Sequence, residues 1–161
     1  MSIGGVLGLG GARVARAIQG DLARRLPSTA RVLVGGWDLG KALAQEGVAV
    51  IVVEAHVKAR RARVPVVKVV AHSRELPFAD GSFDAAVLSG LPEEGLASLV
   101  EWGRVVRPRG LVTLAATASA LLRRVAPPEE LAALFVHATL VEIEQRRQGA
   151  TWLTSGFVRR W

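Results

Sequence analysis

Apolar residues follow two alternating patterns along most of this chain. Short continuous runs of Val, Ile, Leu and Ala recur, and stretches with apolar residues three and four positions apart separate them. Continuous runs are typical of strands that are buried on both faces, as in a parallel sheet covered by helices. The pattern therefore predicts an α/β fold with a doubly wound, Rossmann-like sheet.

The order of these patterns predicts the order of the elements. The first is an amphipathic basic helix over 12–26, which carries Val14, Ile18 and Leu22 on one stripe and ends at Pro27. Strands are then expected at 31–34, 48–54, 66–71, 85–89 and 111–117, helices at 38–45 and 93–106, and a brief turn or helix near 57–63. We expect residues 1–161 to form a single domain, with 1–27 as its N-terminal helix and 28–161 as its core.

The end of the chain has a different pattern. A helix is predicted to begin at Pro127, a first strand to span 136–145, a turn to form at Gln148-Gly149 and a second strand to span 151–158. Two strands joined by a short turn form an antiparallel hairpin. The sheet is thus expected to be mostly parallel, with a C-terminal antiparallel hairpin.

Composition excludes several kinds of chemistry. The chain has no Cys, which rules out disulfides and thiolate catalysis, and His56, His72 and His137 lack the spacing of metal ligands. No metal site is therefore predicted. The apolar start has no basic residue before it and is interrupted by glycines, so we predict neither a signal peptide nor a membrane span. A cytoplasmic location is expected.

The charge of the chain bears on its partners. The formal net charge is +7, which favours an acidic partner. Basic residues recur in pairs, and we expect Arg24 and Arg25 on the first helix to face outward and to contact an acidic protein. Nucleic-acid binding through the same helix is an alternative, although few aromatic residues are present for base stacking. Self-association into a homo-oligomer is left open.

Two segments carry a more specific signal. Residues 76–90 read LPFADGSFDAAVLSG, and residues 96–116 read LASLVEWGRVVRPRGLVTLAA. They resemble the back half of a class I S-adenosylmethionine (SAM) dependent methyltransferase of the type 11 group, in which a strand, a helix ending in R-V-[LV]-[KR]-P and a Gly-led strand follow in that order. The resemblance implies the fold of that family, with Phe78 and Phe83 in the buried core.

The resemblance also assigns the cofactor site. The family's first motif, V-L-[DE]-x-G-x-G-x-G, matches residues 32–40, in which Gly36 and Gly40 are retained, Val34 replaces the acidic residue and Asp38 replaces the middle glycine. This turn brings backbone N–H groups to the methionine half of the ligand. A carboxylate at Asp38 would oppose the carboxylate of the ligand, and its alternative role is to cap the helix that follows.

Two further positions follow from the resemblance. Glu54 matches the acidic residue that binds the ribose hydroxyls, and His72 stands where an Asp would contact the adenine amino group. Only residues 90–92 separate the fourth strand from the next helix, and the chain has no Tyr, so no catalytic residue is predicted. We expect Trp37 either to plug the cleft or to pack over the sheet edge.

These departures from the motif favour one hypothesis over two others. The leading hypothesis is a methyltransferase-like domain that has lost SAM-dependent catalysis, uses no cofactor and acts as a protein-interaction or regulatory module. The first alternative is an active small methyltransferase that binds SAM. The second alternative is a nucleic-acid-binding protein.

Overall fold

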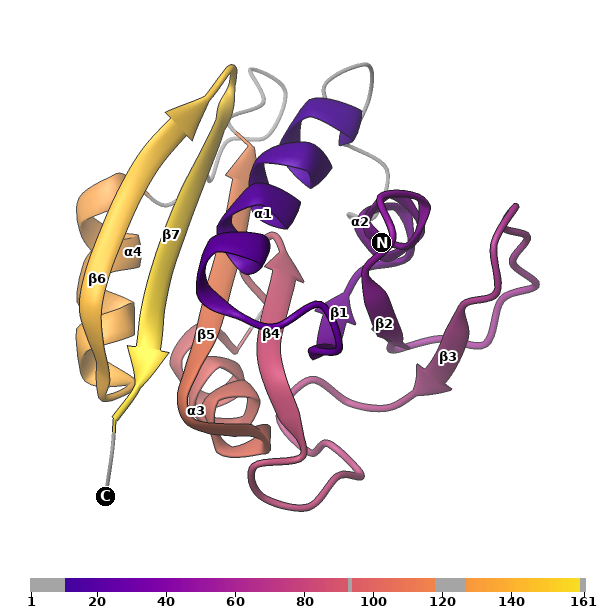
Figure 1. Cartoon of the computed structure of the whole chain (residues 1–161). Helices are drawn as coiled ribbons and strands as arrows, with labels where there is room; N and C mark the ends of the chain where they lie inside the picture. The colour runs from indigo at the N-terminus through magenta and orange to yellow at the C-terminus, as the bar shows by residue number, and fades with distance from the viewer. Residues whose placement is uncertain (1–10, 93, 118–126, 160–161) are drawn as a thin grey trace.

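The computed structural model describes residues 11–92, 94–117 and 127–159, which form one mixed sheet between two layers of helices (Figure 1). In chain order the elements are α1 (Gly11–Arg25), β1 (Arg31–Gly35), α2 (Trp37–Gln45), β2 (Ala49–Glu54), β3 (Val67–Val70), β4 (Phe83–Ser89), α3 (Gly95–Val105), β5 (Val106–Thr117), α4 (Pro128–His137), β6 (Leu140–Gln148) and β7 (Thr151–Val158).

The sheet has the strand order β3-β2-β1-β4-β5-β7-β6. The first five strands in this order pair in parallel, whereas β7 pairs antiparallel with both β5 and β6. The chain leaves β1 toward β2 on one side and returns to β4 on the other. The predicted doubly wound, mostly parallel sheet with a C-terminal antiparallel hairpin is therefore confirmed.

The core consists of two apolar clusters, one on each face of the sheet. On one face, α1 and α2 contribute Val14, Ile18 and Leu39, which pack against buried residues of β1, β2 and β4. On the other face, α3 and α4 bury Trp102 and Phe135 against the central strands and the hairpin. The apolar stripe of the first helix therefore packs against the rest of the chain.

The two arginines at the end of α1 have different surroundings. Arg24 forms an ion pair with Asp21 one turn earlier, and its side chain remains exposed. Arg25 lies over the ring of Phe157 and pairs with Glu144 of β6 at 2.6 Å. The expectation that both arginines face outward therefore holds for Arg24, whereas Arg25 is half-buried because the hairpin reaches this end of α1 and supplies a carboxylate.

Some boundaries differ from those expected. The last helix, α4, continues to His137, because Leu131 and Phe135 place its apolar stripe in the core, and β6 begins at Leu140 rather than at 136. Residues 57–63 form an irregular connection between β2 and β3. The predicted start of the third helix at 93 lies outside the described residues, and that helix ends at Val105.

Residues 104–110, R-V-V-R-P-R-G, form the junction between α3 and β5, and the backbone there is irregular. Val106 is already extended and pairs with Phe83, two residues before Pro108. Arg109 has a φ of 66°. A Cβ at Gly110 would lie 2.6 Å from the carbonyl oxygen of Asp84, so only glycine allows this close approach.

The prediction that Phe78 and Phe83 lie in the buried core is confirmed for Phe83, while Phe78 packs against the core and is only partly buried. Phe83 is 1% exposed, and its ring meets that of partly buried Phe78 edge to face, with 5.0 Å between the ring centres.

Among the helices that the structure describes, none is long and apolar enough to cross a membrane.

Candidate functional site

A cleft of about 390 Å³ opens at the carboxyl ends of the parallel strands. It lies where the connections from β1 and β4 run to opposite sides, which is where open α/β sheets bind ligands. The ends of β1, β2 and β4 and the residues that follow β3 line the cleft together with two residues of α3, Ser98 and Trp102. Gly36, Glu54 and His72, three of the five predicted cofactor-binding residues, lie on its wall, and Asp38 and Gly40 do not line it.

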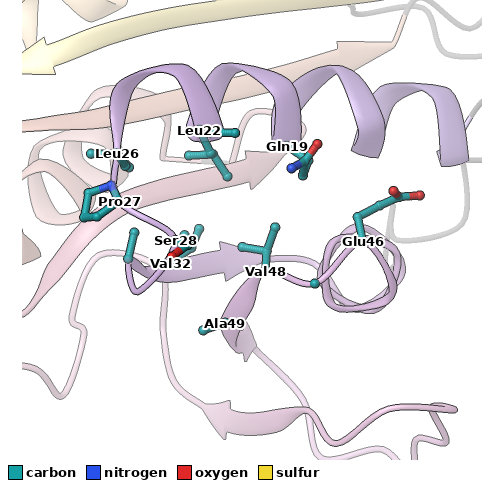
Figure 2. A pocket seen from close by; sticks show the side chains of 12 residues that line it. Gln19, Leu22, Leu26, Pro27, Ser28, Val32, Glu46, Val48 and Ala49 are labelled. Carbon is teal, nitrogen blue, oxygen red and sulfur yellow. The ribbon is translucent and has the colours of Figure 1, made fainter.

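A second hollow, of about 140 Å³, lies at the opposite ends of the strands. Figure 2 shows its wall, which α1 and the starts of β1 and β2 supply through Leu22, Leu26, Val32 and Val48. Its one charged wall residue, Glu46, already pairs with Arg16 at 3.4 Å. The larger cleft therefore remains the candidate site.

The retained glycines allow close packing around the turn after β1. Gly36 has a φ of 119°, and a Cβ there would lie 2.9 Å from the Cβ of Ser89. Gly40, one turn into α2, faces the sheet, where a Cβ would lie 2.3 Å from a methyl group of Val52. Gly36 thus shapes the cleft wall, while Gly40 sets the distance between α2 and β2.

Asp38 does not cap α2. The helix begins at Trp37 and its N-cap is Gly36, with no side-chain hydrogen bond at the cap. Asp38 lies in the first turn, where a negative charge interacts favourably with the helix dipole. The alternative role predicted for this residue is therefore wrong by two positions, because the chain enters the helix directly from the glycine turn. Val34, which replaces the family's acidic residue, is fully buried in β1.

Glu54 lies at the end of β2, and its carboxylate already holds a partner. Arg60 donates to both oxygens, from Nη2 at 2.5 Å and from Nε at 3.2 Å. Lys68 adds a second positive charge 3.8 Å from the same carboxylate. These hydrogen bonds to the Glu54 carboxylate raise the pKa of Arg60 above its ordinary value. A bidentate pair of this kind is among the strongest hydrogen-bonded arrangements of side chains.

Trp37 forms part of the same cluster. It is 8% exposed, it belongs to the core cluster to which α1 and α2 contribute, and it also lines the cleft. The guanidinium of Arg60 lies over its ring, 5.9 Å from the centre. Arg60 is therefore held between a carboxylate and an aromatic face, inside the cleft wall.

His72 follows β3 at the rim of the cleft and is exposed. Its Nδ1 lies 3.9 Å from Glu94, and Arg74 pairs with the same carboxylate at 3.1 Å. Within the described ranges, no group of three or more potential ligand side chains is placed to hold a metal ion.

Sequence reasoning missed the floor of the cleft. The ring of Trp102 lies beneath Gly35, where a Cβ would come within 3.0 Å of it, and its Nε1–H donates to the Oγ of Ser73 at 3.0 Å. Ser98, one helical turn earlier, is fully buried, and its hydroxyl has no hydrogen-bond partner among the residues that the structure describes. In the sequence, the signal for this pair was that Ser98 and Trp102 lie four positions apart on a predicted helix and so share one face of it. Arg60 lies in an irregular segment, and no sequence pattern marked it.

Comparison with known proteins places this cleft in a family. The model of a methyltransferase domain family matches residues 35–114, which include the glycine turn, Glu54, His72 and the segment up to β5. This match covers just under half of the chain, and together with the shared fold it supports the class I SAM-dependent methyltransferase family. The comparison with curated proteins gave no significant match.

Solved structures of this family share the fold. The 1,6-didemethyltoxoflavin-N1-methyltransferase of Burkholderia thailandensis, solved with S-adenosylhomocysteine, is 23% identical over 93% of this chain and 79% of its own, with a TM-score of 0.66. A SAM-dependent methyltransferase of Thermotoga maritima is 18% identical over 92% of this chain and 91% of its own, with a TM-score of 0.64.

A third neighbour is solved together with another protein. The protein in complex with the Trm112 methyltransferase activator of Haloferax volcanii is 15% identical to this methyltransferase-fold chain. The likeness covers 96% of each chain, with a TM-score of 0.68. At these identities the three structures establish the fold only.

Proposed function

We propose that this cytoplasmic protein is a single methyltransferase-fold domain, residues 1–161, that has lost SAM-dependent catalysis and acts by binding another protein. The observation that carries the proposal is the bidentate pair between Glu54 and Arg60. In the family, the acidic residue at the position of Glu54 accepts hydrogen bonds from the ribose hydroxyls of the cofactor. Here, both of its oxygens already accept hydrogen bonds from Arg60, and SAM would have to displace this cation.

The other cofactor positions fit SAM no better. Val34 is a buried apolar side chain where the motif has an acid, and His72 is turned toward Glu94 at the rim. Asp38 stands outside the cleft wall and adds negative charge to the helix start that would face the methionine carboxylate. We therefore assign no reaction step to this cleft and no residue to catalysis.

Calorimetric titration of SAM into the purified protein tests the proposal. We expect the wild type to bind more weakly than a low micromolar dissociation constant, which corresponds to about −8 kcal/mol. Arg60→Ala should bind SAM more tightly than the wild type, because it frees Glu54 for the ribose. Asp38→Gly alone should not restore tight binding, because it leaves Arg60 in place.

The matched control is Arg61→Ala, which removes an adjacent exposed arginine. It should leave SAM affinity unchanged. Two results would reject the hypothesis that Arg60 closes the cleft. One is low micromolar or tighter SAM binding by the wild type, and the other is equal SAM affinity of Arg60→Ala and Arg61→Ala.

An active methyltransferase is the second candidate, and a specific observation favours it. The buried hydroxyl of Ser98 lines the cleft without a hydrogen-bond partner in the described part of the chain, and a bound ligand is one way to satisfy it. Tight SAM binding by the wild type, lost in Ser98→Ala, would support this candidate. The same titration therefore separates the two functions.

One of the structural neighbours supports the proposal that this chain binds a protein partner. That neighbour is solved in complex with a methyltransferase activator, so the fold supports binding of a second protein in at least one relative.

A further inference from the structure

The connection from β2 to β3 and the strand that follows form the most basic part of the chain. Between Glu54 and Glu75 there is no acidic residue, while this stretch holds six cations: Lys58, Arg60, Arg61, Arg63, Lys68 and Arg74. Two of them point at Glu54 and one at Glu94. Lys58, Arg61 and Arg63 are exposed, and no ion pair joins them to any carboxylate in the described part of the chain.

The same region contains an open edge of the sheet. Strand β3 stands at one end of the strand order, its single partner among the described strands is β2, and Figure 1 shows no described strand or helix beyond it. The N–H of Ala71 donates to the carbonyl of Glu54. Backbone groups alternate in direction along a strand, so those of Lys68 and Val70 point to the outer edge.

Natural edge strands are often protected by a lysine that points outward. Lys68 does not provide this protection, because its ammonium group turns to the Glu54 carboxylate and to the carbonyl oxygen of Lys58. Apolar side chains are exposed along the same segment instead: Val57 is 84%, Val67 60% and Val70 44% exposed. The edge is therefore both open and partly apolar.

We propose that this surface, the outer edge of β3 with the basic segment 57–63, binds an extended acidic segment of a partner protein. The segment adds a strand to β3, its carboxylates pair with Lys58, Arg61 and Arg63, and its apolar side chains cover the exposed valines. This inference rests on the proposed protein-binding function and names its surface.

The charge and composition of this surface distinguish three kinds of occupant: a second copy of this chain, a nucleic acid and an acidic peptide. A second copy of this chain would bring the same cations against one another, which opposes self-association at this edge. A nucleic acid would gain from the arginines, but bases bind to exposed aromatic faces, and no aromatic residue stands between Glu54 and Phe78. An acidic peptide uses the cations, the valines and the free backbone groups together.

Fluorescence anisotropy with a labelled peptide of alternating Glu and Val tests the proposal. We expect saturable binding to the full chain that weakens as salt rises. Arg61→Glu/Arg63→Glu should raise the dissociation constant by at least about tenfold, because two attractive contacts become repulsive. The control Arg13→Glu/Arg159→Glu, which makes the same charge change at exposed arginines elsewhere, should leave it within about twofold.

Two further probes identify the kind of ligand. A peptide of alternating Glu and Pro has the same charge but cannot form a strand, and it should bind at least about tenfold more weakly. Equal binding of the two peptides, or equal effects of the two reversal pairs, would overturn the proposal. A single-stranded RNA that binds more tightly than the Glu-Val peptide would overturn it in favour of nucleic acid. None of these results depends on whether the cleft binds SAM.

Discussion

At the scale of single residues, the two glycines retained from the cofactor motif have different structural roles. Gly36 and Gly40 both match the cofactor motif, yet only Gly36 lies on the cleft wall, at a φ of 119°. Gly40 lies against Val52, which is fully buried and whose branched side chain has little freedom to move. The motif therefore retains one glycine for the turn and one for the contact between helix and sheet.

Gly40→Ala should destabilise the protein by about 1–3 kcal/mol, as overpacked core substitutions do. The reason is the distance of 2.3 Å between the new Cβ and a methyl group of Val52. The matched control is Gly20→Ala in α1, where the new Cβ would have no described atom within 4 Å apart from its chain neighbours and the nearby backbone of its own helix. It should stabilise by up to about 1 kcal/mol through helix propensity. Denaturant unfolding of both variants measures the difference, and equal effects would contradict this packing.

At the scale of elements, a network of charged groups holds the turn before β4 against α3. Arg104 donates to the carbonyl oxygens of Leu76 and Phe78 at 3.2 and 3.0 Å, and to Asp80 and Glu101. Glu101 also accepts the N–H of Leu76. Hydrogen bonds from Arg104 lower the pKa of Glu101, and they raise the pKa of Arg104 in turn. Helix α3 thereby holds the turn at Leu76-Pro77-Phe78, which belongs to the segment that resembles the family.

This network predicts acid-sensitive stability. A carboxyl group with a folded-state pKa below its ordinary 4.5 stabilises the fold at higher pH, and the contribution is lost as pH falls through the lowered value. Glu101→Gln should therefore lower the melting temperature near neutral pH, and its deficit relative to the wild type should shrink below pH 4.5. Thermal unfolding over this range measures it. Glu75→Gln, at an exposed neighbouring carboxylate, should change stability by less than about 0.5 kcal/mol.

At the scale of the whole molecule, two ion pairs join the N-terminal helix to the C-terminal hairpin. Asp21 of α1 accepts a hydrogen bond from Arg146 of β6 at 2.6 Å, and its side chain is only 11% exposed. Arg25 and Glu144 form the second pair, in which the glutamate is 66% exposed. The elements at the two ends of the described chain thus stabilise each other across the sheet edge.

Double-mutant cycles should distinguish these two pairs. The coupling between Arg25 and Glu144 is expected to be at most about 1 kcal/mol, as for exposed pairs. The coupling between Asp21 and Arg146 should be larger, because water screens the buried carboxylate less. Urea unfolding of the single and double alanine variants at low and high salt measures both. Equal couplings, or equal loss with salt, would contradict the difference in burial.

The periodicity of apolar residues was sufficient to predict the elements and the class of sheet, because burial of a strand or helix face repeats along the chain. The resemblance of residues 76–116 to one family was sufficient for the fold, and its motif led to Gly36, Glu54 and His72 on the cleft wall. Only the tertiary structure placed Arg60 on Glu54, Trp102 under Gly35 and Glu144 beside Arg25. These contacts join side chains across loops and layers, and their geometry leaves no periodic signal in the sequence.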